Sequence, residues 1–129
     1  MIVVDTNVVC YLLIRGEHSD IVQRLFDADS DWVAPRLLFD ELLNVLVTYE
    51  RKSLLGSRQI MVIVHEALEL IGDALYELPP ERVLAVARRT GLSGYDSQFV
   101  ALAENLDVPL LTWDRQMIER CPTVARTPA

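Results

Sequence analysis

The sequence alternates short apolar runs with longer segments of helical periodicity, and this alternation limits the possible folds more than any other feature. The run Ile2–Val4 is β-branched and uninterrupted, which is typical of a strand buried on both faces. Similar runs occur at 32–34, 74–76 and 110–112, with segments of helical spacing between them. Strands that alternate with helices favour an α/β fold, with a mostly parallel sheet of four to five strands covered by helices on both faces.

Capping residues predict where several helices begin. Asp5, with the two polar residues after it, can cap a helix over Val8–Ile14, and Ser19 can cap the next one. Asp114 can begin a short helix near the C-terminus. The longest helical patterns cover 36–51, 57–71 and 96–105.

The composition excludes several classes of protein. Hydrophobic residues make up 51% of the 129 residues, which is too high for a disordered chain, and the length predicts one domain over 1–129. No apolar run approaches the roughly 18 residues of a membrane span, and the N-terminus lacks the basic start of a signal peptide. Two cysteines are too few for a disulfide framework, so we expect a cytoplasmic protein without membrane association. The net charge of −7 argues against binding of polyanions over the whole surface, but it allows an acidic site that holds a cation.

Four acidic residues are expected near the ends of the predicted strands. Asp5 follows the first strand directly, Asp114 lies two residues past a late strand, and Asp96 begins a helix. Glu41 lies one to two turns into the helix after the second strand, with Asn44 on the same face. Because parallel sheets place their sites at the carboxyl ends of the strands, all four acids can reach one site.

Four carboxylates in one cleft need a compensating charge, because their repulsion otherwise raises their pKa values. Mg²⁺ and Mn²⁺ prefer oxygen ligands, and such ions activate water and stabilise the charge of phosphodiester attack. Taken singly, each acid has a simpler explanation. Asp5 and Asp114 could be helix caps. Asp96 could be a first-turn acid, and Glu41 a solvated helix residue. Asp40 points about 100° away from Glu41 around the helix and is expected to face solvent or to lie behind the ligands.

Four segments resemble, in order, the motifs of the PIN-domain ribonucleases, and within them the VapC toxins of toxin–antitoxin pairs. Residues 2–8 resemble the strand that ends in Asp-Thr or Asp-Ser, and 35–46 resemble the helix that carries the family's Glu. Residues 92–103 resemble the third motif, with Ser97 where the family usually has Ala, and 109–114 resemble the fourth. The ordered set covers nearly the whole chain, and it implies a three-layer α/β/α PIN-like fold.

The resemblance implies an endoribonuclease that hydrolyses RNA with Mg²⁺ or Mn²⁺. Its catalytic and metal-binding residues would be Asp5, Glu41, Asp96 and Asp114. Supporting polar residues would be Thr6, Asn7, Asn44, Ser97 and Thr112. The resemblance further implies a homodimer, a cognate VapB-like antitoxin that covers the acidic site, and a block of translation or growth by RNA cleavage.

Several other side chains are candidates for contacts with RNA. Arg88, Arg89 and Arg115 flank the acidic segments and are the preferred substrate-binding candidates, although ordinary surface charge explains any single arginine. Trp113, beside Asp114, could stack on a base.

Other protein classes fit the sequence less well. A signalling receiver domain needs a lysine after a late strand, and the only lysine, Lys52, is not in that place. A haloacid-dehalogenase-like phosphatase needs Asp-x-Asp, and Asn7 stands at the second acidic position. His18 and His65 are expected to be surface or packing residues, which favours a metal over histidine acid–base chemistry. A stand-alone PIN nuclease of RNA processing and a non-catalytic PIN scaffold that binds RNA or protein stay open, and the presence of all four acids favours activity.

Overall fold

The centre of the protein is a five-stranded sheet in which every pair of neighbouring strands is parallel. The computed structural model describes all of residues 1–129. In chain order the strands are β1 (Ile2–Val4), β2 (Trp32–Pro35), β3 (Leu75–Tyr76), β4 (Leu110–Leu111) and β5 (Ala125–Arg126). Their order in the sheet is β3-β2-β1-β4-β5, so β1 is central, and Val3 faces Val33 on one side and Leu110 on the other. The predicted α/β class and mostly parallel sheet are confirmed.

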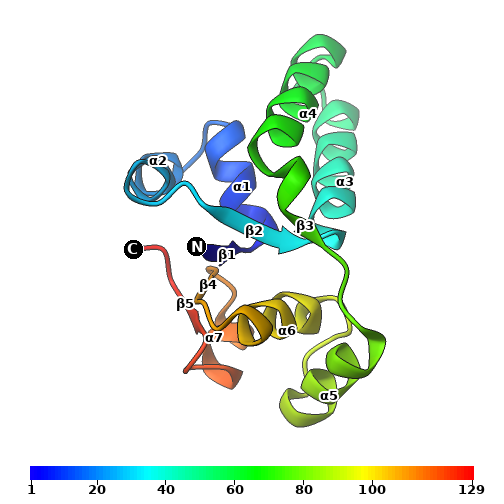
Figure 1. The fold of residues 1–129 in the computed structure, drawn as a ribbon. Helices are drawn as coiled ribbons and strands as arrows, with labels where there is room; N and C mark the ends of the chain where they lie inside the picture. The colour runs from blue at the N-terminus through cyan, green and yellow to red at the C-terminus, as the bar shows by residue number, and fades with distance from the viewer.

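Helices cover both faces of this sheet (Figure 1). They are α1 (Thr6–Leu13), α2 (Ser19–Ala28), α3 (Leu37–Arg51), α4 (Ser57–Ile71), the 3₁₀ turn η1 (Gly72–Ala74), α5 (Pro80–Thr90), α6 (Asp96–Leu106) and α7 (Arg115–Arg120). Figure 1 shows α1 to α4 on one side of the sheet and α5 to α7 on the other. None of these helices combines the length and the apolar character that crossing a lipid bilayer requires.

Two groups of buried side chains hold the layers together. The larger one surrounds the sheet and includes Val3, Val4 and Phe99, which are fully buried or nearly so. The smaller one lies between α3 and α4 and consists of Leu42, Leu46, Ile63 and Ala67. Because Leu42 is fully buried next to Glu41 in the chain, this second group fixes the part of α3 that carries the glutamate.

The structure differs from the sequence-based prediction at the first two helices. Helix α1 begins at Thr6 and not at Val8, because Oδ1 of Asp5 accepts a 2.8 Å hydrogen bond from the backbone N–H of Thr6. The prediction that Ser19 caps α2 was wrong. Its buried hydroxyl accepts from the N–H of Gly16 at 2.8 Å and donates to the carbonyl of Tyr11 at 2.7 Å, so it closes the loop between α1 and α2.

Candidate active site

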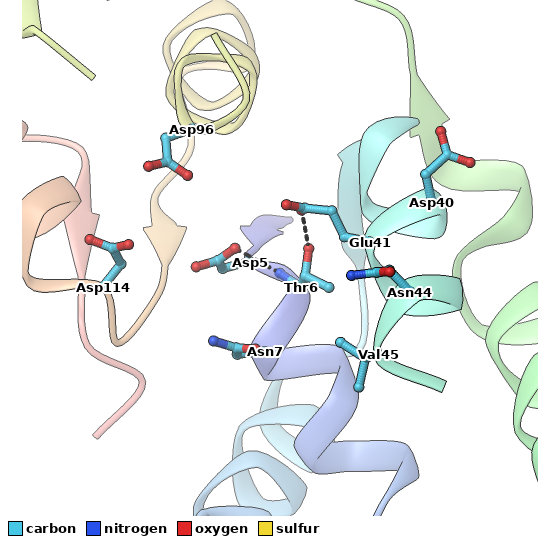
Figure 2. A pocket seen from close by; sticks show the side chains of 9 residues that line it. All are labelled: Asp5, Thr6, Asn7, Asp40, Glu41, Asn44, Val45, Asp96 and Asp114. Carbon is cyan, nitrogen blue, oxygen red and sulfur yellow. Dashed lines mark hydrogen bonds between the residues drawn. The ribbon is translucent and has the colours of Figure 1, made fainter. Parts of the chain in front are cut away.

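The four predicted acids line one cavity of about 420 Å³ at the carboxyl edge of the sheet. Figure 2 shows that they come from four different parts of the fold and surround a common space. Asp5 follows β1, Glu41 belongs to α3, Asp96 begins α6, and Asp114 lies between β4 and α7. The complete lining is Asp5, Thr6, Asn7, Asp40, Glu41, Asn44, Val45, Asp96 and Asp114.

Asp5 is held more firmly than the other acids, since both of its oxygens accept hydrogen bonds. Oδ1 caps α1 through the N–H of Thr6, and Oδ2 accepts from the hydroxyl of Thr112 at 2.6 Å. The partly buried position of Asp5 between the ends of β1 and β4 follows from their parallel pairing, which sets Val4 opposite Leu111. Asp5 is therefore both a helix cap and a cavity residue, so its role as a cap does not exclude a functional role.

Glu41 is tied to the start of α1 by a contact between distant parts of the chain. The hydroxyl of Thr6 donates a 2.6 Å hydrogen bond to Oε1 of Glu41, as Figure 2 shows. Thr6 is buried, and its backbone N–H donates a hydrogen bond to the carboxylate of Asp5, so the position of its hydroxyl group is well defined. Thr6 therefore positions two of the acids: it contacts Asp5 through its backbone N–H and Glu41 through its hydroxyl group.

Asp114 is positioned by the same threonine that contacts Asp5. Its N–H donates to the hydroxyl oxygen of Thr112 at 2.9 Å, and its Oδ1 accepts from the N–H of Met117 at 3.1 Å as the N-cap of α7. The sequence-based prediction that Asp114 begins this helix is confirmed. Its remaining carboxylate oxygen makes no hydrogen bond within the protein and is left for the cavity.

Asp96 enters the cavity from the first residue of α6. Its backbone N–H donates to the hydroxyl of Ser93 at 3.0 Å, a contact that the sequence-based prediction missed, although a serine three residues before a helical acid is a typical capping signal. Upstream, Gly91 caps the C-terminal end of α5, and its φ of 74° reverses the chain toward this loop. The Ser93 hydroxyl also lies near the Asp96 carboxylate and lowers its pKa, but no hydrogen bond of ordinary length fixes that carboxylate.

The cavity is acidic and has no cation of its own. Lysine, arginine and histidine are absent from its lining, and none of the four acids takes part in an ion pair. Burial raises the pKa of Asp5, and the hydrogen bonds from Thr112 and Thr6 oppose that rise. Burial is also the main cause that raises the pKa of Glu41 and of Asp96, with further rises from neighbouring carboxylates. The repulsion that the sequence predicted is therefore present.

This set of donors fits a hard divalent cation. Carboxylate oxygens are the ligands that Mg²⁺ and Mn²⁺ prefer, and a positive ion would remove the repulsion among the four groups. The side chains stand apart around the cavity, and no three of the acidic, histidine or cysteine side chains converge closely enough to hold one ion together. Mg²⁺ usually keeps several of its waters, so it would need few direct contacts from Asp5, Glu41, Asp96 and Asp114.

Three of the five predicted supporting residues, Thr6, Asn7 and Asn44, line the cavity, whereas Thr112 lies behind it, bonded to Asp5, and Ser97 lies elsewhere. Asn7 and Asn44 are exposed and line the cavity, as does Asp40, at its rim. Figure 2 shows Asp40 directed away from the other acids, in agreement with the predicted position. Ser97 does not reach the cavity: it is fully buried in α6, and its hydroxyl has no hydrogen-bond partner. The helical turn that points Asp96 outward points the next residue into the core.

The three predicted substrate-binding arginines lie outside the acidic cavity. Arg88, Arg89 and Arg115 are exposed, and none of them is part of the lining. Arg89 is engaged in an ion pair with Glu104 of α6. The guanidinium groups of Arg88 and Arg115 form no ion pair with the protein.

Trp113 is packed against other aromatic side chains. Its ring stacks on His18 with centroids 4.2 Å apart and an interplanar angle of 12°. Tyr11 meets Trp113 edge-on at 5.6 Å and His18 edge-on at 5.0 Å. His18 is therefore a packing residue, as predicted, and it covers one face of the indole that was considered for base stacking.

Known proteins resemble this chain in sequence and in fold. The curated protein Ribonuclease VapC3 from Pyrobaculum aerophilum is 29% identical over 127 residues, which are 95% of this chain and 96% of that protein. The crystal structure of FitAcB from Neisseria gonorrhoeae is similar with a TM-score of 0.71 and 20% identity, over 99% of this chain and 98% of that one. A toxin–antitoxin complex from Klebsiella pneumoniae gives a TM-score of 0.73 and 17% identity, over 100% of this chain and 98% of that one. The sequence profile of the PIN domain matches residues 2–121, and the chain therefore belongs to the PIN domain family.

Proposed function

We propose that this protein is a Mg²⁺- or Mn²⁺-dependent endoribonuclease that hydrolyses phosphodiester bonds in RNA. The observation that carries the proposal is the gathering of four carboxylates, with no protein cation, at the carboxyl edge of a parallel sheet. The curated relative is named a ribonuclease, which supports the same activity for this chain.

Asp5, Glu41, Asp96 and Asp114 would hold the divalent ion. When bound, such an ion activates a water and stabilises the negative charge of the attacked phosphodiester. Asp5 is fixed through both oxygens, so it is the anchor of the set. Thr112 and Thr6 keep Asp5 and Glu41 oriented toward the cavity.

Asp96 is the acid best able to accept a proton from the attacking water. No hydrogen bond of ordinary length fixes its carboxylate, and the nearby Ser93 hydroxyl is the one group that lowers its pKa, whereas the other three acids each accept at least one hydrogen bond. Burial and the nearby Asp114 and Asp5 raise the pKa of Asp96, and a carboxylate with a raised pKa is a stronger base. Arg88 and Arg115, exposed and free of ion pairs, would contact RNA phosphates outside the cavity.

We further assign the protein as the toxin of a toxin–antitoxin pair, acting as a homodimer in the cytoplasm and stopping growth or translation by RNA cleavage. A solved structure with the same fold is described as a toxin–antitoxin complex, which supports a VapB-like antitoxin as the partner. The exposed apolar side chains of Met61, Val62 and Leu68 on α4 offer surface for protein contacts.

The activity is tested by incubating the purified protein with RNA in Mg²⁺, in Mn²⁺ and in chelator. We expect cleavage only with a metal ion, and a loss of at least about 100-fold in rate for Asp96→Asn. The matched control is Asp73→Asn, an exposed aspartate of η1 outside the cavity, which is expected to cleave normally. Cleavage in chelator, or by Asp96→Asn, would contradict the assigned site. RNA binding without cleavage under either metal would favour the binding-module alternative.

A further inference from the structure

A second, smaller cavity lies next to the acidic one. It measures about 110 Å³ and sits between α1 and α3. Its lining is Asn7, Cys10, Tyr11, Ile14, Arg15, Gly16, Val45 and Tyr49. Asn7 and Val45 line both cavities, so the two spaces adjoin, and Figure 2 shows these two side chains on the side of the acidic cavity away from Asp96.

The chemistry of this second cavity is opposite to that of the first. It contains no carboxylate, and its one charged lining residue is Arg15. Burial, with Asp5 and Glu41 nearby, raises the pKa of the Cys10 thiol to about 12, so the thiol is neutral in ordinary buffers. Aliphatic groups and aromatic rings form most of the remaining wall. The cavity is therefore suited to a flat, mostly apolar group that is joined to a negatively charged one.

Two tyrosines supply aromatic surface from different helices. Tyr11 of α1 is held by edge-on contacts with His18 and Trp113. Tyr49 of α3 is partly buried one turn after Val45 on the same helix face. Gly16 leaves room beside Tyr11, since a Cβ at that position would come within 3.2 Å of the tyrosine ring. The ring of Tyr11 is thus fixed by packing before any ligand arrives.

The volume limits the occupant to a single ring system. Pockets for drug-sized ligands measure roughly 300–1,000 Å³, several times more than this one. Aromatic side chains, with a polar edge available from Asn7, are the usual surroundings of an unpaired nucleobase. Arg15 is exposed and paired only with the exposed Asp20, a weak surface ion pair that a phosphate can replace.

We propose that the α1–α3 cavity is a base subsite, which holds one nucleobase of single-stranded RNA close to the cleaved phosphodiester, while Arg15 contacts a flanking phosphate. This assignment rests on the proposed ribonuclease activity and deepens it, because a base held beside the acids makes cleavage sequence-dependent. Tyr11 and Tyr49 act here in place of Trp113, whose indole is stacked on His18.

The test uses the full-length protein and random-sequence single-stranded RNA with Mn²⁺, with the cut ends sequenced. The best-cleaved sequence is then remade with a single abasic nucleotide at each position in turn. We expect one position next to the cut at which loss of the base lowers kcat/KM about 10-fold or more. On the intact oligonucleotide, Tyr49→Ala should lower kcat/KM by the same factor. On the abasic oligonucleotide, Tyr49→Ala should lower kcat/KM no further. Tyr49→Phe, which keeps the ring, should have a kcat/KM near that of the unaltered protein.

Leu54→Ala is the matched control, since Leu54 is 63% exposed and lines neither cavity. Thermal unfolding of each variant shows that it is folded. If the unaltered protein cleaves but no abasic position matters, or if Tyr49→Ala keeps its kcat/KM, the base subsite is overturned and the ribonuclease proposal stands. If Tyr49→Ala cleaves RNA normally but is inhibited less by the antitoxin, the cavity binds a side chain of the antitoxin and not a base of the RNA. No cleavage by the unaltered protein would overturn both proposals.

Discussion

The hydroxyl of Thr112 donates a 2.6 Å hydrogen bond to Oδ2 of Asp5, although 107 residues separate the two in the chain. The hydroxyl oxygen of Thr112 in turn accepts from the N–H of Asp114 at 2.9 Å. One fully buried threonine therefore sets the positions of two acids that belong to opposite ends of the sequence.

Thr112→Val should destabilise the protein by about 1–3 kcal/mol, because it removes a hydrogen bond to a carboxylate and leaves the N–H of Asp114 without its acceptor. The shape of the side chain is nearly unchanged, so the loss reports the hydroxyl group. Thr112→Ser should keep most of the stability. Urea unfolding of both variants measures the difference.

The control for this pair is Thr48→Val. Thr48 is exposed on α3 and its hydroxyl donates to the carbonyl of Asn44 at 3.0 Å, a contact that water can replace. We expect a change within about 0.5 kcal/mol there. Equal stability of Thr112→Val and the unaltered protein would show that the buried hydroxyl does not hold the two acids.

Divalent ions should stabilise the folded protein. An ion that binds only the folded state at 100 times its Kd adds about 2.7 kcal/mol to the free energy of unfolding. Thermal unfolding with Mg²⁺ or Mn²⁺ against chelator checks this, and Asp5→Asn should remove most of the effect, since Asp5 is the fixed member of the acidic set. A rise in Tm that survives Asp5→Asn would place the ion elsewhere.

In chelator, the contribution of the acidic cavity to stability should decrease as the pH rises above about 4. The pKa values of Asp5, Glu41 and Asp96 are raised above ordinary values of 3.8, 4.5 and 3.8, mainly by burial. A carboxyl group with a raised pKa binds its proton more tightly in the folded state. Its contribution is fully present below the ordinary value and is lost as the pH rises through the folded pKa.

Asp96→Asn should flatten this dependence, and urea unfolding between pH 4 and 8 measures it. Asp29 does not change the pH dependence of stability between pH 4 and 8, because the N–H of Asp31 lowers its pKa. The contribution of Asp29 to stability is lost only as the pH falls through that lower pKa. A pH profile that is the same for Asp96→Asn and the unaltered protein would contradict the assigned repulsion.

Ser97→Ala should stabilise the protein by about 1–2 kcal/mol. The buried hydroxyl of Ser97 has no partner, so its removal relieves an uncompensated desolvation, and alanine is also the better helix former. Cleavage activity should be unchanged, because Ser97 does not line the acidic cavity. A lower free energy of unfolding for Ser97→Ala would mean that the hydroxyl does have a partner in solution.

Local signals in the sequence were enough for much of the fold. The β-branched run at Ile2–Val4 and the helical spacing in α3 and α4 predicted elements that the structure contains, because burial on one face or two dictates which positions are apolar. The prediction for Ser19 failed because a hydroxyl near a helix start has several possible partners. The carbonyl of Tyr11 in α1 and the N–H of Gly16 in the following loop supplied better partners than α2 did.

The sequence by itself predicted that Asp5, Glu41, Asp96 and Asp114 would reach one edge of a parallel sheet, since strands that alternate with helices pair in parallel and end at the same edge. Only the tertiary structure decided which neighbours hold them. The bonds of Thr112 to Asp5 and of Thr6 to Glu41, the burial of Ser97 and the cavity between Tyr11 and Tyr49 depend on packing between segments far apart in the chain. Periodicity specifies which face of an element is buried, but the partner of a side chain is fixed only when those faces meet.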